Sequence, residues 1–188
     1  GVGLVIFDEF HERSIHADLA LALSRECQEV LRPELRLLIM SATLDMEKLS
    51  SLLDAPVVES NGRQYPVEVH YTGQQDIKLL PELTARAVAD AYNKHEGDIL
   101  VFLPGQGEIM KCAELIKRQT KGLLVNPLYG QLPFNIQQRA ILPDSKGRRK
   151  VVLATSIAET SLTIEGVKVV IDTGYGRVSR FDPNSGLS

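Results

Sequence analysis

Short apolar runs alternate with amphipathic stretches along this 188-residue chain, which is the order expected of an α/β fold. The first run, residues 2–7, is apolar apart from Gly3 and then gives way abruptly to charge. Such a run is typical of a strand buried on both faces of a parallel sheet. Helical spacing of apolar positions predicts a helix over 15–31, which Pro33 ends. A second strand is predicted over 35–43, and a short helix over 44–53.

After the predicted helix over 44–53, the chain is less regular until residue 67. Val67, Val69 and Tyr71 alternate with polar residues and predict a strand, and a turn-prone polar segment follows near residue 75. We place a domain boundary there, between 1–75 and 76–188. The second part predicts helices over 81–94, 106–120 and 134–142, strands over 97–105, 123–129, 149–156 and 166–174, and a hairpin over 176–188. The fold class is therefore α/β, with parallel sheets flanked by helices and the first domain incomplete.

Composition narrows the class of protein only slightly. A net charge of −3 gives no global basic signal, so any contact with nucleic acid has to rest on local groups. The two cysteines, Cys27 and Cys112, lie far apart and suit free thiols in a reducing compartment such as the cytoplasm. No apolar run approaches the ~18 residues of a membrane span, and no leader opens the chain, so we expect no membrane partner. The chain begins inside a predicted strand, as a piece of a longer protein would.

Two adjacent carboxylates, Asp8 and Glu9, follow the first predicted strand. At the end of a buried strand, such a pair can hold Mg²⁺ through water with one carboxylate and polarise an attacking water with the other. Adjacent residues at a strand end point in different directions, which lets the two carboxylates serve different partners. From this pair alone, a charged loop after a core strand is the other interpretation.

Longer motifs give the pair a context. Asp8-Glu9-Phe10-His11, followed by Glu-Arg-Ser, resembles the second motif of the DEAH-box branch of superfamily 2 helicases, with Phe10 as in the bacterial HrpB-like group. Ser-Ala-Thr at 41–43 resembles the third motif, "ILVFLPGQGEI" the fourth, and "ATSIAETSLTI" the fifth. The resemblance covers nearly the whole chain and implies RecA-like domains, ATP and Mg²⁺ as cofactors, and a single strand of RNA or DNA as partner.

The resemblance also implies roles for individual residues. It implies that Asp8 and Glu9 hold Mg²⁺, with Asp8 doing so through water, and that Glu9, Asp8 and His11 form the catalytic group. The other implied roles are coupling of hydrolysis to domain movement by Ser41 and Thr43, nucleotide contacts by Ser161, Thr163 and Glu165, and nucleic-acid contacts by Thr155, Gly130, Arg177 and Arg180. Glu165 stands where many relatives have Asp. The alternatives are a turn rich in helix-capping hydroxyls around 155–163 and a plain surface hairpin with solvated arginines.

The sequence contains no Gly-x-x-x-x-Gly-Lys-Ser/Thr loop and no arginine-rich sixth motif. We therefore expect the chain to be a piece of an ATP-dependent helicase that is inactive by itself, because the phosphate cradle and the arginine finger supply much of the catalysis. The alternative is a nucleic-acid-binding or partner-docking module that keeps the shape of a helicase without hydrolysing ATP.

Overall fold

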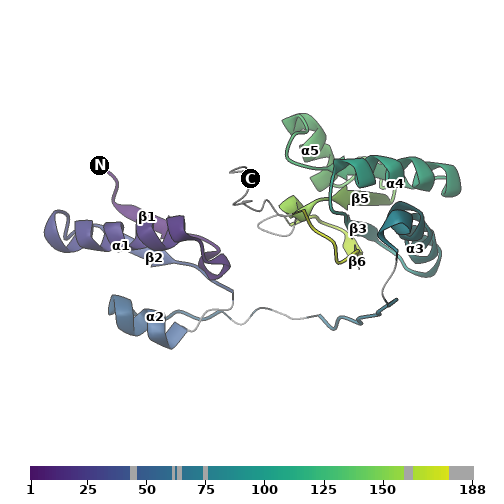
Figure 1. Ribbon diagram of the computed structural model, residues 1–188. Helices are drawn as coiled ribbons and strands as arrows, with labels where there is room; N and C mark the ends of the chain where they lie inside the picture. Colours follow the sequence, from purple (N-terminus) through teal and green to yellow (C-terminus); the bar gives the residue numbers. More distant parts are fainter. Residues whose placement is uncertain (43–45, 61, 63–64, 74–75, 159–162, 178–188) are drawn as a thin grey trace, which may run out of the picture. The chain divides into compact units, whose positions relative to one another are not determined.

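Figure 1 shows the computed structural model of the chain, which describes residues 1–42, 46–60, 62, 65–73, 76–158 and 163–177. It falls into two compact units, Gly1–Glu68 (unit 1) and Val69–Ser188 (unit 2). Sequence analysis places the domain boundary near residue 75. Parallel sheets flanked by helices are found in both units, as the sequence predicts.

Unit 1 contains a parallel pair of strands connected by a helix. β1 (Leu4–Phe7) pairs with β2 (Arg36–Ile39), and Leu4 lies opposite Arg36. The connection runs through a 3-10 turn, η1 (Phe10–Glu12), and α1 (Ile15–Val30), and α2 (Met46–Leu53) follows β2. Ser14 caps α1, because its Oγ accepts a hydrogen bond of 3.1 Å from the amide of Ala17.

One face of this sheet packs and the other does not. Phe7, Phe10 and Leu21 form the buried cluster of unit 1, with half-buried side chains from both strands and both helices around it. Alternate strand residues point to the opposite face. The exposed apolar side chains there are Leu4, Ile6, Leu38 and Met40.

Unit 2 contains a larger sheet with helices on both faces. Its four strands are all parallel and lie in the order β4-β5-β3-β6. In chain order the elements are η2 (Ile77–Leu79), α3 (Leu80–Lys94), β3 (Asp98–Phe102), α4 (Gln106–Gln119), β4 (Leu124–Leu128), α5 (Phe134–Ile141), β5 (Lys150–Ala154), η3 (Ser156–Ala158) and β6 (Val167–Asp172).

The two faces of the larger sheet have separate cores. Ile99 and Val101 of β3 pack with α3 and α4, whereas Leu100 of the same strand packs with Ala140 of α5 and Ile164. All five residues of β5 are buried, as in a strand covered on both faces. The sequence predicts this burial for the first strand, and that prediction is wrong, because only Phe7 of β1 is buried. Among the described residues, no helix combines the length and the apolar character that a membrane-spanning segment requires.

The strand predicted at Val67, Val69 and Tyr71 is not formed, and that prediction is wrong for the described residues. These side chains are exposed, and 65–73 has no regular secondary structure. An alternating pattern becomes a strand only where a neighbouring strand supplies the hydrogen-bonded ladder. No strand among the described residues pairs with this segment.

A buried lysine connects β5 to α5. The side chain of Lys150 is 1% exposed, and its Nζ donates to the carbonyls of Ala140, Ile141 and Leu142 at 2.9, 3.0 and 2.7 Å. All three ammonium hydrogens are therefore used to cap the carboxyl end of α5. Burial lowers the pKa of Lys150, while the negative charge of Asp98 acts in the opposite direction.

The Lys150→Met variant is expected to destabilise unit 2 by about 3 kcal/mol, because each buried carbonyl that loses its donor costs about 1–3 kcal/mol. Cys112 offers a measurement, since it is a free, buried thiol whose pKa is raised by burial to about 12. Alkylation of Cys112 by iodoacetamide should be about 100-fold faster in the variant. Lys121→Met, at an exposed position, is the control and should leave the rate unchanged. Equal rates in Lys150→Met and the native chain would contradict this role.

Candidate active site and nucleic-acid interface

The two predicted catalytic carboxylates lie in a tight turn directly after β1. Glu9 has a left-handed backbone, with φ 49° and ψ 37°, and its amide donates a hydrogen bond of 2.8 Å to Asp8 Oδ1. A left-handed conformation is uncommon for a residue other than glycine, and it costs about 1–3 kcal/mol.

Phe10 anchors the turn by burying its ring in the core of unit 1. Its ring is buried and meets the ring of Phe7 edge to face at 6.1 Å between centroids. Its amide donates to Met40 O at 3.0 Å, and the amide of Met40 donates to Phe7 O at 2.8 Å. The chain after β1 is thereby joined to the chain after β2, which brings Ser41 to the same end of the sheet as Asp8 and Glu9.

His11 and Ser41 complete the described part of this cluster. His11 Nδ1 lies 3.3 Å from Glu9 Oε2, an ion pair when the imidazole is protonated. Within the described part of the chain, His11 Nδ1 and Ser41 Oγ are buried atoms that make no hydrogen bond. Thr43, the other predicted coupling residue, lies outside the described residues.

The donor set suits a hydrated Mg²⁺ ion rather than a metal held by protein alone. The described residues contain no group of three or more His, Cys, Asp or Glu side chains that could enclose a metal ion. Magnesium usually keeps several waters and takes only one or two carboxylates, with substrate phosphates as further ligands. Asp8 is exposed, and among the described residues no arginine or lysine pairs with it. Asp8 and Glu9 therefore fit the metal that the sequence predicts.

The predicted nucleic-acid residues of unit 2 lie at the carboxyl ends of its strands. Gly130 follows β4 and is exposed, Thr155 follows β5, and Arg177 follows β6. The amide of Thr155 donates to Leu128 O at 3.2 Å, so the chain segments after β4 and β5 lie side by side. The structure thus brings Gly130 and Thr155 together. Arg180 lies outside the described residues.

The predicted nucleotide contacts lie elsewhere on unit 2. Glu165 is exposed and precedes Gly166, whose carbonyl accepts a 2.8 Å hydrogen bond from the amide of Asp98 at the start of β3. Glu165 therefore lies near the amino ends of the strands, and Thr155 near their carboxyl ends. Thr163 is exposed in the same connection between β5 and β6, and Ser161 lies outside the described residues.

Two contacts at the carboxyl ends involve residues that sequence analysis did not single out. Gln106 Nε2 donates to the hydroxyl of Tyr129 at 3.1 Å, which joins the start of α4 to the end of β4. Arg177 Nη2 donates to both carboxylate oxygens of Glu108, at 3.0 and 3.3 Å. Glu108 is 69 residues away from Arg177 in sequence, so only the Pro-Gly that follows β3 could have drawn attention to this position.

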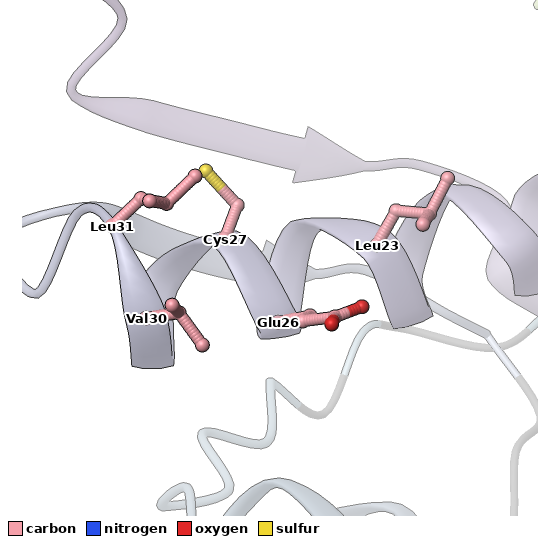
Figure 2. A pocket seen from close by; sticks show the side chains of 5 residues that line it. All are labelled: Leu23, Glu26, Cys27, Val30 and Leu31. Atoms are coloured by element: carbon pink, nitrogen blue, oxygen red, sulfur yellow. The ribbon is translucent and has the colours of Figure 1, made fainter.

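A shallow apolar hollow of about 240 Å³ lies on α1 and contains none of the predicted site residues. Figure 2 shows its lining, which comes from the carboxyl-terminal half of the helix and consists of Leu23, Glu26, Cys27, Val30 and Leu31. One acidic side chain among apolar ones offers little for the chemistry that Asp8 and Glu9 suggest.

Comparison with known proteins decides the family. Residues 77–182 match the family described as helicase conserved C-terminal domain. The chain belongs to this helicase family. It is 53% identical to the ATP-dependent RNA helicase HrpB of Escherichia coli over the whole chain, and 40% identical over 98% of the chain to the pre-mRNA-splicing factor ATP-dependent RNA helicase prp22 of Schizosaccharomyces pombe. The resemblance to HrpB-like DEAH-box helicases that the motifs predict is confirmed.

Solved helicase structures show the same fold. The crystal structure of the E. coli DEAH/RHA helicase HrpB matches the entire chain with a TM-score of 0.84 at 52% identity. A second E. coli structure, of the DExH-box NTPase HrpB, matches with a TM-score of 0.78. The chain spans 24% of the length of E. coli HrpB and 16% of that of the S. pombe relative.

Truncation of Phe10 tests whether its buried ring holds the turn that carries Asp8 and Glu9. Phe10→Ala should destabilise unit 1 by about 3–5 kcal/mol, because a buried ring is replaced by a cavity. Hydrogen exchange measured by mass spectrometry should become faster in peptides covering residues 4–12. Phe134→Ala removes a ring that is 78% exposed and should leave exchange in these peptides as it is. Unchanged exchange in Phe10→Ala would mean that Phe10 does not anchor the turn.

Proposed function

We propose that the chain is part of an ATP-dependent helicase that couples ATP hydrolysis to movement along, or unwinding of, RNA. The observation that carries the proposal is the pair Asp8 and Glu9, held in a turn at the end of the parallel strand β1 and joined by hydrogen bonds to the end of β2. The similarity of the whole chain to a protein named an ATP-dependent RNA helicase supports RNA over DNA as the strand. The two free cysteines support a reducing compartment such as the cytoplasm.

The two parts of the chain, divided near residue 75, would have different roles. We assign residues 1–75 to the carboxyl-terminal part of a first RecA-like, ATP-binding domain, and 76–188 to the second RecA-like domain. Asp8 would hold Mg²⁺ through water, with Glu9 beside it, and the ion would neutralise charge on the phosphates of ATP. Glu9, whose backbone is left-handed, would orient and deprotonate the attacking water.

Three neighbouring residues, His11, Ser41 and Thr43, would position Glu9 and couple hydrolysis to domain movement. His11, 3.3 Å from Glu9, restrains the carboxylate. Ser41 and Thr43 follow β2, and a hydroxyl there can sense the occupied or empty state of the phosphate site and pass it on. This coupling supports the use of hydrolysis to drive movement.

Unit 2 would hold the nucleotide and the strand with separate groups. Thr155, Gly130 and Arg177, with Arg180, would contact phosphates of the strand, because hydroxyls, backbone amides and guanidinium groups bind phosphate without reading the base. Ser161, Thr163 and Glu165 would approach the nucleotide. The separation of Glu165 from Thr155 to opposite ends of the strands supports two distinct contact regions.

The Glu9→Gln variant of the full-length protein tests the proposal. It should lower RNA-stimulated ATP hydrolysis by about 10²–10⁴-fold while ATP still binds, because the amide keeps the shape of Glu9 but cannot accept a proton. Hydrolysis is measured by phosphate release, and ATP binding by the fluorescence of a labelled ATP analogue.

Glu12→Gln makes the same chemical change in the same turn, at an exposed residue, and should hydrolyse ATP at the native rate. If the native protein binds RNA without hydrolysing ATP, a binding module is the better description. A Glu9→Gln variant that hydrolyses ATP at the native rate would contradict the proposal that Glu9 deprotonates the attacking water.

A further inference from the structure

The ion pair between Arg177 and Glu108 links two segments that are distant in sequence. Arg177 belongs to the chain after β6, and Glu108 to the first turn of α4. Arg177 Nη2 contacts both oxygens of the carboxylate, at 3.0 and 3.3 Å. The side chain of Arg177 is 70% exposed and that of Glu108 is 27% exposed. A solvent-exposed pair of this kind is weak, so its guanidinium can change partners.

Gly105, which has no side chain, leaves room for the guanidinium of Arg177 beside the start of α4. A Cβ at this position would lie 3.0 Å from both Arg177 Nε and Glu108 Oε2, closer than most real contacts of a Cβ atom. The missing side chain at residue 105 therefore lets Arg177 lie across the turn between β3 and α4. Among the described residues, only the Nη2 nitrogen of this guanidinium donates a hydrogen bond.

The backbone that carries Arg177 is held without the ion pair. Thr173 Oγ1 donates to Phe102 O at 2.8 Å, and the ring of Tyr175 packs against the core beside α3 and α4. Arg177 can therefore leave Glu108 without releasing the segment after β6.

Arg177 is also the cation in the region where the strand is proposed to bind. It is the one positively charged side chain among the described residues that directly follow the four strands of unit 2, namely 103–105, 129–133, 155–158 and 173–177. Glu108 neutralises that charge. Carboxylate and phosphate present similar pairs of oxygens to arginine, so a phosphate of the strand competes with Glu108 for Nη2 of Arg177.

We propose that Glu108 and a backbone phosphate of the bound strand compete for Arg177, so that Glu108 lowers the affinity of the protein for nucleic acid. The inference rests on the proposed function, since it takes a single strand as the partner. When the strand dissociates, the ion pair between Arg177 and Glu108 forms again. Arg177 thereby contributes to binding without holding the strand so tightly that it cannot move.

The test measures binding of fluorescein-labelled oligouridylate to the full-length protein, without ATP, by fluorescence anisotropy. Glu108→Gln removes the competing charge and should tighten binding about two- to five-fold, the range that a surface ion pair supports. Arg177→Gln should weaken binding and lower the slope of log affinity against log salt by about 0.7 to 1. In the Arg177→Gln background, Glu108→Gln should have no further effect, because both act through one contact.

Glu82→Gln is the matched control. Glu82 pairs with Lys111 at 2.8 Å, joining α3 to α4, and its loss changes the net charge by the same amount without touching Arg177. It should leave binding unchanged. Tightening in Glu82→Gln, or tightening by Glu108→Gln that persists without Arg177, would show a general effect of charge and overturn the competition.

Weaker binding in Glu108→Gln would overturn the proposal as well, since Glu108 would then help Arg177 to meet the strand. Either result leaves the proposed function standing if the native protein binds oligouridylate. A native protein that binds neither oligouridylate nor oligothymidylate would overturn both the inference and the nucleic-acid partner.

Discussion

Parallel pairing of strands is the constraint on which the rest of this structure depends. In a parallel sheet all strands end at the same edge, and the residues that follow them meet there. In unit 1 this brings Asp8, Glu9 and Ser41 to one end of β1 and β2. In unit 2 it brings Gly130 and Thr155 together in the same way. Residues that are scattered in sequence become neighbours because their strands run in one direction.

The interior of each unit holds these ends in position. The five buried residues of β5 and the apolar faces of α3, α4 and α5 fix the larger sheet, and Lys150 satisfies the end of α5 inside it. In unit 1 the ring of Phe10, next to Glu9 in sequence, packs against Phe7 in the buried cluster and holds the turn that carries the two carboxylates. Asp8 is exposed and Glu9 is half-buried, so the residues that stabilise unit 1 differ from those for which we propose a chemical role.

Much of the fold could be predicted from local patterns, and the rest depends on distant contacts. Apolar runs and helical spacing predict α1, α3 and α4 within a residue or two, because one buried face determines each of them. The strand at 67–71 could not be judged locally, since an alternating pattern needs a partner strand. The motifs predict Asp8, Glu9 and Thr155 as site residues, whereas the pair Arg177 and Glu108 and the buried Lys150 arise only when separate elements pack.

In the proposed function, Asp8 and Glu9 form the phosphate-hydrolysis centre of a motor that holds its strand on unit 2. A structure of the full-length protein with Mg²⁺, a non-hydrolysable ATP analogue and oligouridylate tests it most directly. We expect the metal beside Asp8, the terminal phosphate beside Glu9, and strand phosphates along Thr155 and Gly130. Phosphates bound away from Asp8 and Glu9, or a strand that does not touch the carboxyl ends of the unit 2 strands, would contradict it.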